Sequence, residues 1–278
     1  MKRARFGLVV AVTVCGLIAA ASGQSFNVAV GPPDQVPSPS YAGAGMAGQW
    51  LALPVYHNTT TFNLTDVNGV VTPVQVWQYG GTELKTLNDP STSGDDEKLM
   101  DHCQVTYTLP LETCLFFRNL EYGEYEIIVY AWMPGAPATR SLTSCDEEFG
   151  LPHHIVGGAW PGQHQEFVTY SRHRASAGPP LGLLRLHSGI VPGDSEALGA
   201  ACNGVQLRKL PPKAVADMNC DGAINGADIG AFVDALANSS QYYSAHTTCR
   251  IDNADVNNDG QITPDDVGPF VSAVLNGN

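Results

Sequence analysis

Long apolar runs are scarce in this 278-residue chain, and the single one lies at its beginning. The basic stretch of residues 1–5 precedes an apolar run from Phe6 to Ala21, and polar residues resume at Ser22. A basic start, a short apolar run and small residues after it are typical of a secretory signal peptide, whereas a membrane-spanning helix needs about 20 apolar residues. We therefore expect a cleaved signal over residues 1–23 and a mature chain that is secreted, extracellular or at the cell surface, without membrane insertion.

Positive charge is also scarce. The chain has 14 Lys and Arg residues against 27 Asp and Glu residues, and its formal net charge is -13. Loss of the basic residues at the start with the signal would make the mature chain more negative still. Because nucleic acids and anionic lipid surfaces repel such a chain, the composition excludes nucleic acid as a partner.

Short catalytic motifs are missing as well. The sequence contains no Gly-x-Ser-x-Gly elbow, no phosphate-binding loop, no His-Glu-x-x-His and no Cys-x-x-Cys, so the usual hydrolase, nucleotide and zinc sites are not indicated. Its acidic runs, residues 95–97 and 146–148, are predicted to be solvated loops. The histidines at positions 153, 154, 164 and 173 are predicted to lie on the surface. No catalytic residue is therefore predicted.

Six cysteines remain once the signal is removed: Cys103, Cys114, Cys145, Cys202, Cys220 and Cys249. An even number in a chain bound for an oxidising compartment favours disulfides. Cys220 and Cys249 lie inside and just before two similar loops, and we expect them to be bridged. The pairing among the other four cysteines stays open.

Residues 24–208 favour a β domain. They are rich in Gly, Pro, Ser and Thr, and short runs of β-branched and aromatic residues alternate with these turn formers. Strands are expected over residues 70–77, 104–109, 125–132 and 181–186, with a hairpin turn at Asn68-Gly69. The predicted fold class is mostly β, with an N-terminal jelly-roll-like β-sandwich. Residues 209–216, which include Pro211-Pro212, are the predicted linker.

The tail, residues 217–278, repeats itself at a spacing of 38 residues. Two twelve-residue segments begin at Asp217 and Asp255, with oxygen-bearing side chains at positions 1, 3, 5 and 12 and glycine at position 6. These are the positions at which an EF-hand loop binds Ca²⁺. Two calcium ions are predicted, one held by Asp217, Asn219, Asp221, the carbonyl of Ala223 and Asp228, the other by Asp255, Asn257, Asp259, the carbonyl of Gln261 and Asp266.

The repeat continues beyond the ligands. Phe232-Val233 matches Phe270-Val271, so each loop is expected to lead into a short amphipathic helix. The tail resembles the type I dockerin, a module of two calcium loop-helix units. That resemblance implies a small α-helical module over residues 217–278, stabilised by Ca²⁺, and a cohesin-like or other extracellular protein as its partner.

The end of the β domain carries a second resemblance. The stretch from Cys202 to Leu207 is similar to the closing strand of galactose-binding-like and other jelly-roll carbohydrate-binding domains, and the two-part organisation looks like that of secreted planctomycete proteins. A polysaccharide ligand is implied. Because aromatic side chains form platforms for sugars, Trp160, in the glycine-rich segment 156–162, is the candidate ligand contact.

The sequence thus predicts a secreted, calcium-binding, non-catalytic binding or assembly protein, in which a dockerin-like tether carries a carbohydrate- or protein-binding sandwich. Two alternatives remain open. One is a small glycoside hydrolase or other polysaccharide-degrading enzyme, which would need two carboxylates roughly 5 to 10 Å apart. The other is a structural protein of the cell surface.

Overall fold

A computed structural model describes residues 24–54, 60–108, 112–146, 153–246 and 248–277. The predicted signal peptide lies outside these residues, as do Glu147 and Glu148 of the second acidic run. Within the described ranges, no helix is both long enough and apolar enough to cross a membrane.

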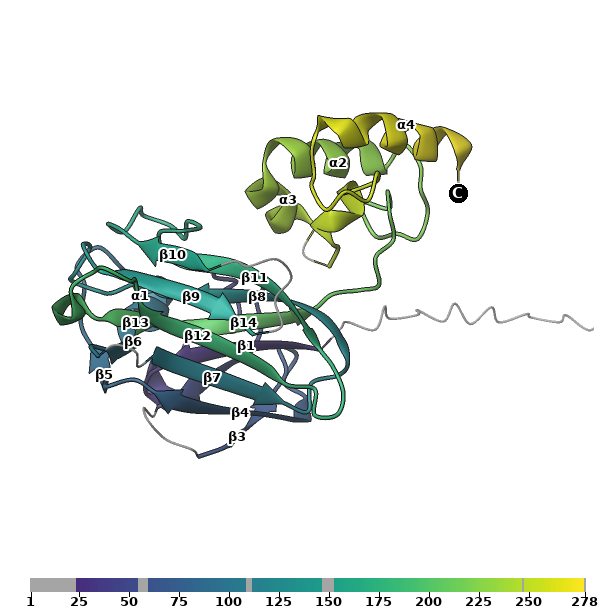
Figure 1. Cartoon of the computed structure of the whole chain (residues 1–278). Coiled ribbons are helices and arrows are strands. Elements are labelled where there is room, and N and C mark those ends of the chain that lie inside the picture. Colours follow the sequence, from purple (N-terminus) through teal and green to yellow (C-terminus); the bar gives the residue numbers. More distant parts are fainter. Residues whose placement is uncertain (1–23, 55–59, 109–111, 147–152, 247, 278) are drawn as a thin grey trace, which may run out of the picture.

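Two large sheets form the N-terminal domain (Figure 1). The first has the order β11 (Tyr170–Ala177), β8 (Gly123–Tyr130), β14 (Gly204–Lys209), β1 (Ser25–Val30) and β2 (Trp50–Leu53). The second has the order β10 (His154–Gly157), β9 (Arg140–Cys145), β12 (Leu184–Ile190), β7 (Glu112–Arg118), β4 (Val71–Gly80) and β3 (Phe62–Thr65). The pairing of β1 with β2 is parallel, and the other pairings between these strands are antiparallel.

The core lies between these two sheets. Alternate residues of each strand point inward, as the two-residue period of a strand requires, and apolar side chains from both sheets form one buried cluster. The cluster includes Phe26, Val28, Ile127, Val129, Val205 and Leu207 from the first sheet and Val74, Val76, Leu115, Phe117, Leu184 and Leu186 from the second. This face-to-face packing is a β-sandwich, as predicted. Its strands β4, β8 and β12 overlap three of the four segments expected from the sequence, and the fourth expected segment overlaps β6 (His102–Thr106) of a third sheet.

The expected hairpin turn joins β3 to β4. Gly69 has a φ of 85°, and the Asp66 carboxylate accepts hydrogen bonds from the backbone N–H groups of Asn68 and Val70 at 2.9 and 2.8 Å. Glycine adopts this left-handed conformation without steric cost. The turn prediction is confirmed.

A third sheet and a short helix cover one end of the sandwich. The sheet has the order β13 (Ala200–Cys202), β6 (His102–Thr106) and β5 (Glu83–Thr86), and α1 spans Gly94–Met100. Two 3-10 turns, η1 (Pro33–Gln35) and η2 (Glu196–Leu198), complete this domain. The acidic run at 95–97 is therefore not a solvated loop, because it forms the first turns of α1, where carboxylates interact favourably with the helix dipole.

The four cysteines of the sandwich domain are buried thiols, which corrects the expectation of further disulfides. Cys103 packs near Met133 below the third sheet, whereas Cys202 belongs to the core between the large sheets. Cys114 lies 4.0 Å from the imidazole of His187. Cys145 belongs to the same core as Cys202, and burial raises the pKa of Cys202 to about 12. An even count of cysteines carries no information about such packing.

The C-terminal module lies above the sandwich in Figure 1, at the end of an extended connection after β14. It consists of α2 (Asp228–Ala237), α3 (Ser239–Ala245), η3 (Ile251–Ala254), η4 (Pro264–Asp266) and α4 (Val267–Asn276). Helices α2 and α4 follow the two predicted loops, and the rings of Phe232 and Phe270 stack with their centroids 3.8 Å apart. The repeated phenylalanines thus form the centre of a separate small core.

Candidate functional sites

The two predicted calcium loops have the same backbone turn. Position 6 is glycine with a left-handed φ in both, 86° at Gly222 and 84° at Gly260. Position 4 is left-handed as well, at Cys220 (56°) and Asn258 (61°). Side chains other than glycine adopt this conformation rarely. Because this conformation recurs at the same positions in both repeats, the two loops have the same backbone turn.

The last residue of each loop has a buried carboxylate that accepts hydrogen bonds from the backbone of the same loop. Asp228 and Asp266 are both 0% exposed. Asp228 accepts hydrogen bonds from the N–H groups of Met218, Asn219 and Asn225, at 2.7, 3.1 and 2.9 Å. Asp266 repeats this pattern with Val256, Asn257 and Thr263, at 2.8, 3.1 and 2.9 Å. Although burial works against it, these donors hold the pKa of Asp266 below its ordinary value.

The first carboxylate differs between the loops. In the first loop, Asp217 Oδ2 accepts the N–H of Gly222 at 3.0 Å, and its buried Oδ1 has no hydrogen-bond partner among the described residues. In the second loop, Asp255 Oδ1 accepts the N–H of Asp259, and Oδ2 lies 3.1 Å from the ammonium of Lys213. An orphaned buried carboxylate oxygen fits a cation, and in the second loop a lysine already supplies one.

A cation in either loop would need several kinds of oxygen ligand. Among the described residues, no three Asp, Glu, His or Cys side chains gather closely enough to hold a metal by themselves. A cation here therefore also needs the amide oxygens of Asn219 and Asn257 and the carbonyls of Ala223 and Gln261. Such neutral oxygens are ordinary ligands of Ca²⁺ and poor ligands of zinc.

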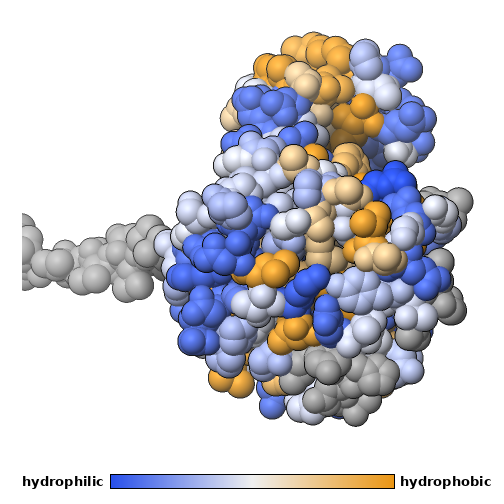
Figure 2. Space-filling model, turned by 90° about the vertical axis from the view of Figure 1, so that its left-hand side faces the viewer, coloured by the Kyte–Doolittle hydropathy of each residue, from blue (hydrophilic) through white to orange (hydrophobic). Residues whose placement is uncertain are grey.

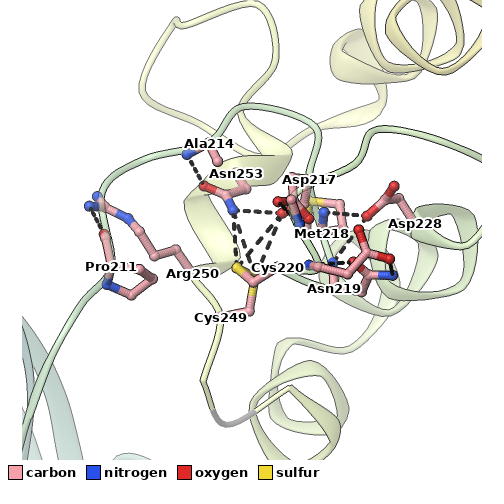
Figure 3. Close-up of a disulfide and its surroundings, with 12 residues drawn as sticks. Pro211, Ala214, Asp217, Met218, Asn219, Cys220, Asp228, Cys249, Arg250 and Asn253 are labelled. Atoms are coloured by element: carbon pink, nitrogen blue, oxygen red, sulfur yellow. Dashed lines mark hydrogen bonds between the residues drawn. A yellow bond between two sulfur atoms is a disulfide. The ribbon is translucent and has the colours of Figure 1, made fainter. Parts of the chain in front are cut away.

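The predicted disulfide between Cys220 and Cys249 is confirmed (Figure 3). Beside it, the Asn253 amide donates a hydrogen bond to the Asp217 carbonyl at 2.7 Å, and its own oxygen accepts the N–H of Ala214 at 3.0 Å. The disulfide therefore joins the first loop to the segment that leads into the second.

An exposed apolar face covers the helices of the module. Ile229, Val233, Val267, Val271 and Leu275 are between 41% and 80% exposed. Ile229 and Val233 in α2 occupy the same places as Val267 and Val271 in α4, so the face is itself duplicated. Figure 2 shows apolar surface gathered over the end of the module. Soluble proteins seldom leave such a patch without a partner.

The structure places Trp160, the predicted ligand contact, in a half-buried position. Its ring meets that of Trp132 edge to face at 5.6 Å and that of His164 at 5.5 Å. The indole N–H of Trp132 donates to the Gly158 carbonyl at 2.9 Å and so fixes the glycine-rich segment. Trp160 is thus part of an aromatic cluster and presents only part of its surface.

The histidines are less exposed than predicted. His173 is buried and lies 2.9 Å from the Ser171 hydroxyl, whereas His154 is half-buried and His153 is exposed. The prediction of surface histidines is wrong for His173 and for His164, whose largely buried ring contacts Asp96 at 3.4 Å. That hydrogen bond holds the pKa of Asp96 below its ordinary value.

A polar site that the sequence did not reveal lies on the outer face of the six-stranded sheet. Tyr79, Cys114, His187 and Ser144 stand side by side across β4, β7, β12 and β9. His187 contacts Glu112 at 2.7 Å and the carboxylate of residue 146 at 3.0 Å. Burial lowers the pKa of His187, but its hydrogen bonds to Cys114 and Glu112 outweigh this and raise it to about 10.

Aromatic residues continue this outer face. Trp77 and Phe116 stack at 4.9 Å, and the Arg118 guanidinium lies 5.3 Å from the Trp77 ring. Tyr79 is 52% exposed. The site was missed because its members come from four strands whose pairing the sequence does not specify. Only the alternation of Gln75, Trp77 and Tyr79 along one strand could have indicated it.

The sequence matches no protein-family model, and no curated protein matches it. Seven chains of solved structures match, among them three with 11 to 12% identity. One is a chain from the complex of the plant peptide RALF23 with FER and LLG2, with 12% identity over 74% of this chain and 44% of that chain and a TM-score of 0.40. The protein therefore spans less than half of that structure's length.

The other two structures come from carbohydrate-active proteins. The C-terminal CBM6 of the marine laminarinase LamC from Zobellia galactanivorans shows 11% identity over 48% of this chain and 99% of that chain, with a TM-score of 0.25. The exo-β-1,3-galactanase of Phanerochaete chrysosporium shows 11% identity over 55% and 34%, with a TM-score of 0.25. At these values, the likenesses identify neither a family nor a ligand.

Proposed function

We propose that the protein is a secreted, non-catalytic binding and assembly protein, whose C-terminal module folds around two calcium ions and tethers a carbohydrate-binding sandwich to an extracellular partner. One observation supports the proposal that the module binds calcium. The two loops share their left-handed positions and the threefold hydrogen bonding of Asp228 and Asp266.

Calcium has a structural role in this proposal. Asp217, Asn219, Asp221, Asp228 and the Ala223 carbonyl would hold one ion, and the equivalent residues of the second loop would hold the other. When bound, Ca²⁺ neutralises carboxylates that otherwise repel one another. Binding free energy then becomes folding free energy of the module.

Calorimetric titration of the full chain tests the calcium sites. We expect two ions per chain and a lower melting temperature of the module after EDTA treatment. Asp217→Asn should remove one ion, whereas Asp265→Asn, which makes the same change at an exposed position of the second loop that is not a predicted ligand, should keep both. A module whose melting is indifferent to EDTA would contradict the proposal.

The duplicated apolar face supports the tether. Ile229, Val233, Val267, Val271 and Leu275 fit a cohesin-like or other extracellular protein that offers an apolar surface of its own. Val233→Asp and Val271→Asp should abolish capture of a recombinant cohesin by the calcium-loaded chain. Capture that persists in both variants would exclude this face.

A carbohydrate ligand suits the sandwich because its outer face combines exposed Tyr79 with carboxylate, imidazole and guanidinium groups that can bond sugar hydroxyls. The full chain should be retained on insoluble polysaccharides such as laminarin gel or β-1,3-galactan without releasing reducing sugar.

A glycoside hydrolase is the second candidate, favoured by the two carboxylates that flank His187 on an exposed face. It predicts release of reducing sugar that Glu112→Gln abolishes. Absence of release from any polysaccharide retained by the chain would leave binding as the activity.

A further inference from the structure

A cavity of about 880 Å³ lies between the sandwich and the C-terminal module. One wall consists mainly of residues of β8, β11 and β14, with His154 and Glu166 beside them, and the other consists mainly of α3, η3 and part of the second loop. Ligand sites commonly occupy cavities of roughly 300 to 1,000 Å³ at domain interfaces. The cavity lies apart from the outer face of the six-stranded sheet, because its strands belong mainly to the other sheet.

Ion pairs hold the two walls together. Arg250 of the module lies 2.5 Å from Glu124 of the sandwich, and Arg174 of the sandwich lies 2.8 Å from Asp252 of the module. The Arg250 side chain is only 5% exposed, so water screens this pair less than a surface pair. These contacts define a docked arrangement of the two domains.

A cation–π contact adds to the docking. The Arg172 guanidinium of β11 lies 3.8 Å from the ring centroid of Tyr243 in α3. Arg172 also pairs with Glu126 at 3.1 Å. Its guanidinium is therefore held between the domains by one partner from each.

The charges in the cavity wall balance. Five Arg or Lys residues and five Asp or Glu residues line it, and four of the five carboxylates are already in ion pairs. A wall of this kind has no net attraction for a strongly charged ligand. It does offer many hydrogen-bond donors and acceptors, which suit hydroxyl groups.

Glu166 is the fifth carboxylate. It lines the cavity, is half-buried, and its side chain has no hydrogen bond or ion pair to any residue in the described ranges. Burial raises the pKa of Glu166. The next residue, Phe167, has a left-handed φ of 65°, and such backbone strain is found at binding sites more often than elsewhere. The Glu166 carboxylate is therefore a hydrogen-bond acceptor in the cavity wall without a donor among the described residues.

We propose that this cavity binds a short, uncharged oligosaccharide, that Glu166 accepts a hydrogen bond from a sugar hydroxyl, and that the site is complete only while the module is docked. The inference rests on the carbohydrate-binding function proposed above and adds a second binding site, separate from the outer face of the six-stranded sheet. It also couples the ligand to the second calcium loop, because Asp255, Gly260 and Ile262 of that loop line the cavity and the first loop does not.

Calorimetry on the calcium-loaded full chain tests the proposal, with cellohexaose and laminarihexaose as neutral probes and hexagalacturonate as the anionic probe. A neutral probe should bind, and Glu166→Ala should weaken it about tenfold or more, as expected for a hydrogen bond to a charged group. Glu196→Ala, at an exposed site in η2, should leave binding unchanged.

The outcomes separate the site from the function. If a neutral probe binds and Tyr79→Ala weakens it while Glu166→Ala does not, the carbohydrate function stands and the cavity proposal falls. If only hexagalacturonate binds, the inference that the balanced charges of the cavity wall favour a neutral ligand is wrong. If no probe binds to a chain shown by circular dichroism to be folded, both proposals fail. Asp255→Asn should weaken the neutral probe more than Asp217→Asn, and equal effects would refute the link to the second loop.

Discussion

The charge state of His187 depends strongly on its surroundings. It lies between two carboxylates on the outer face of the six-stranded sheet, its side chain is 16% exposed, and its pKa is raised to about 10. In the unfolded chain a histidine titrates near 6.5. Folding therefore favours the protonated imidazole, and its stabilising effect is present in full below the unfolded pKa.

This contribution should disappear as pH rises. Between about pH 6.5 and 10 the folded chain holds a proton that the unfolded chain has lost, so the free energy of unfolding falls across that interval. We expect His187→Gln to flatten the fall by about 1 kcal/mol, since both carboxylates are partly exposed and water screens the pairs. Urea unfolding of the unmodified protein and of His187→Gln at pH 6, 8 and 10 measures this difference. An equal fall of the unfolding free energy with pH in both proteins would contradict the prediction.

Single residues also show what a sequence can reveal. The two matching loops could be predicted because the spacing of their oxygen-bearing side chains is visible along the chain, and their binding of Ca²⁺ stays a prediction. Glu166 and His187 were not, because their neighbours come from strands far away in the sequence. The same holds for Asp95, which accepts hydrogen bonds from the backbone and side chain of Ser38 at 3.0 and 2.5 Å.

At the scale of elements, the disulfide is the main covalent support of the module. Cys220 and Cys249 are separated by 29 residues, and a cross-link of that span stabilises a domain by about 2 to 4 kcal/mol, mainly by restricting the unfolded chain. The double variant Cys220→Ala with Cys249→Ala should lower the stability of the calcium-free module by that amount. The control is Cys103→Ala, which should leave the module's transition in place in a denaturant titration.

The pairing of α2 with α4 depends on two aromatic side chains. Phe232 and Phe270 are each 3% exposed and stack at 3.8 Å. Truncation of a buried phenylalanine costs about 3 to 5 kcal/mol, so Phe270→Ala should unfold the module or lower its melting temperature sharply. Val271→Ala, at the exposed neighbouring position, should cost little. Similar melting curves for the two variants would show that the stack is not the centre of the core.

Elements with a periodic signal were predicted, and elements without one were missed. The 38-residue repeat indicated α2 and α4, and alternating residues indicated β4 and β8. Helix α1 was missed because its acidic first turn looks like a solvated loop, and its charges are satisfied by Ser38, Tyr41 and His164. Helix α3 was also missed, since it lies in the stretch between the repeats.

At the scale of the whole molecule, we expect the ion pairs between the two domains to keep the module docked on the sandwich. Asp252→Arg would place a cation against Arg174 and Arg250 and should separate the domains. X-ray scattering should then give a larger radius of gyration, whereas Asp265→Arg, at an exposed site, should not change it. An unchanged radius in Asp252→Arg would mean that other contacts suffice for docking.

The sandwich itself could be predicted from turn residues and strand composition, but the order of its strands could not. Strand order depends on which inward faces fit together, and many orders satisfy the same alternation. The docking of the module was beyond prediction for a similar reason. Arg172, Glu124 and Tyr243 are ordinary charged and aromatic residues until the fold brings them together.

The strand order also decides when the sandwich can close. Strand β14, the last of the domain, lies between β8 and β1 in the middle of its sheet, and Ser25 of β1 pairs with Arg208 of β14. While the chain is being synthesised, β1 must wait for almost the entire domain to emerge before it meets this neighbour. Such distant pairings slow folding. A chain that cannot fold early stays open to chaperones for longer, and its sheet closes only when the last strand arrives.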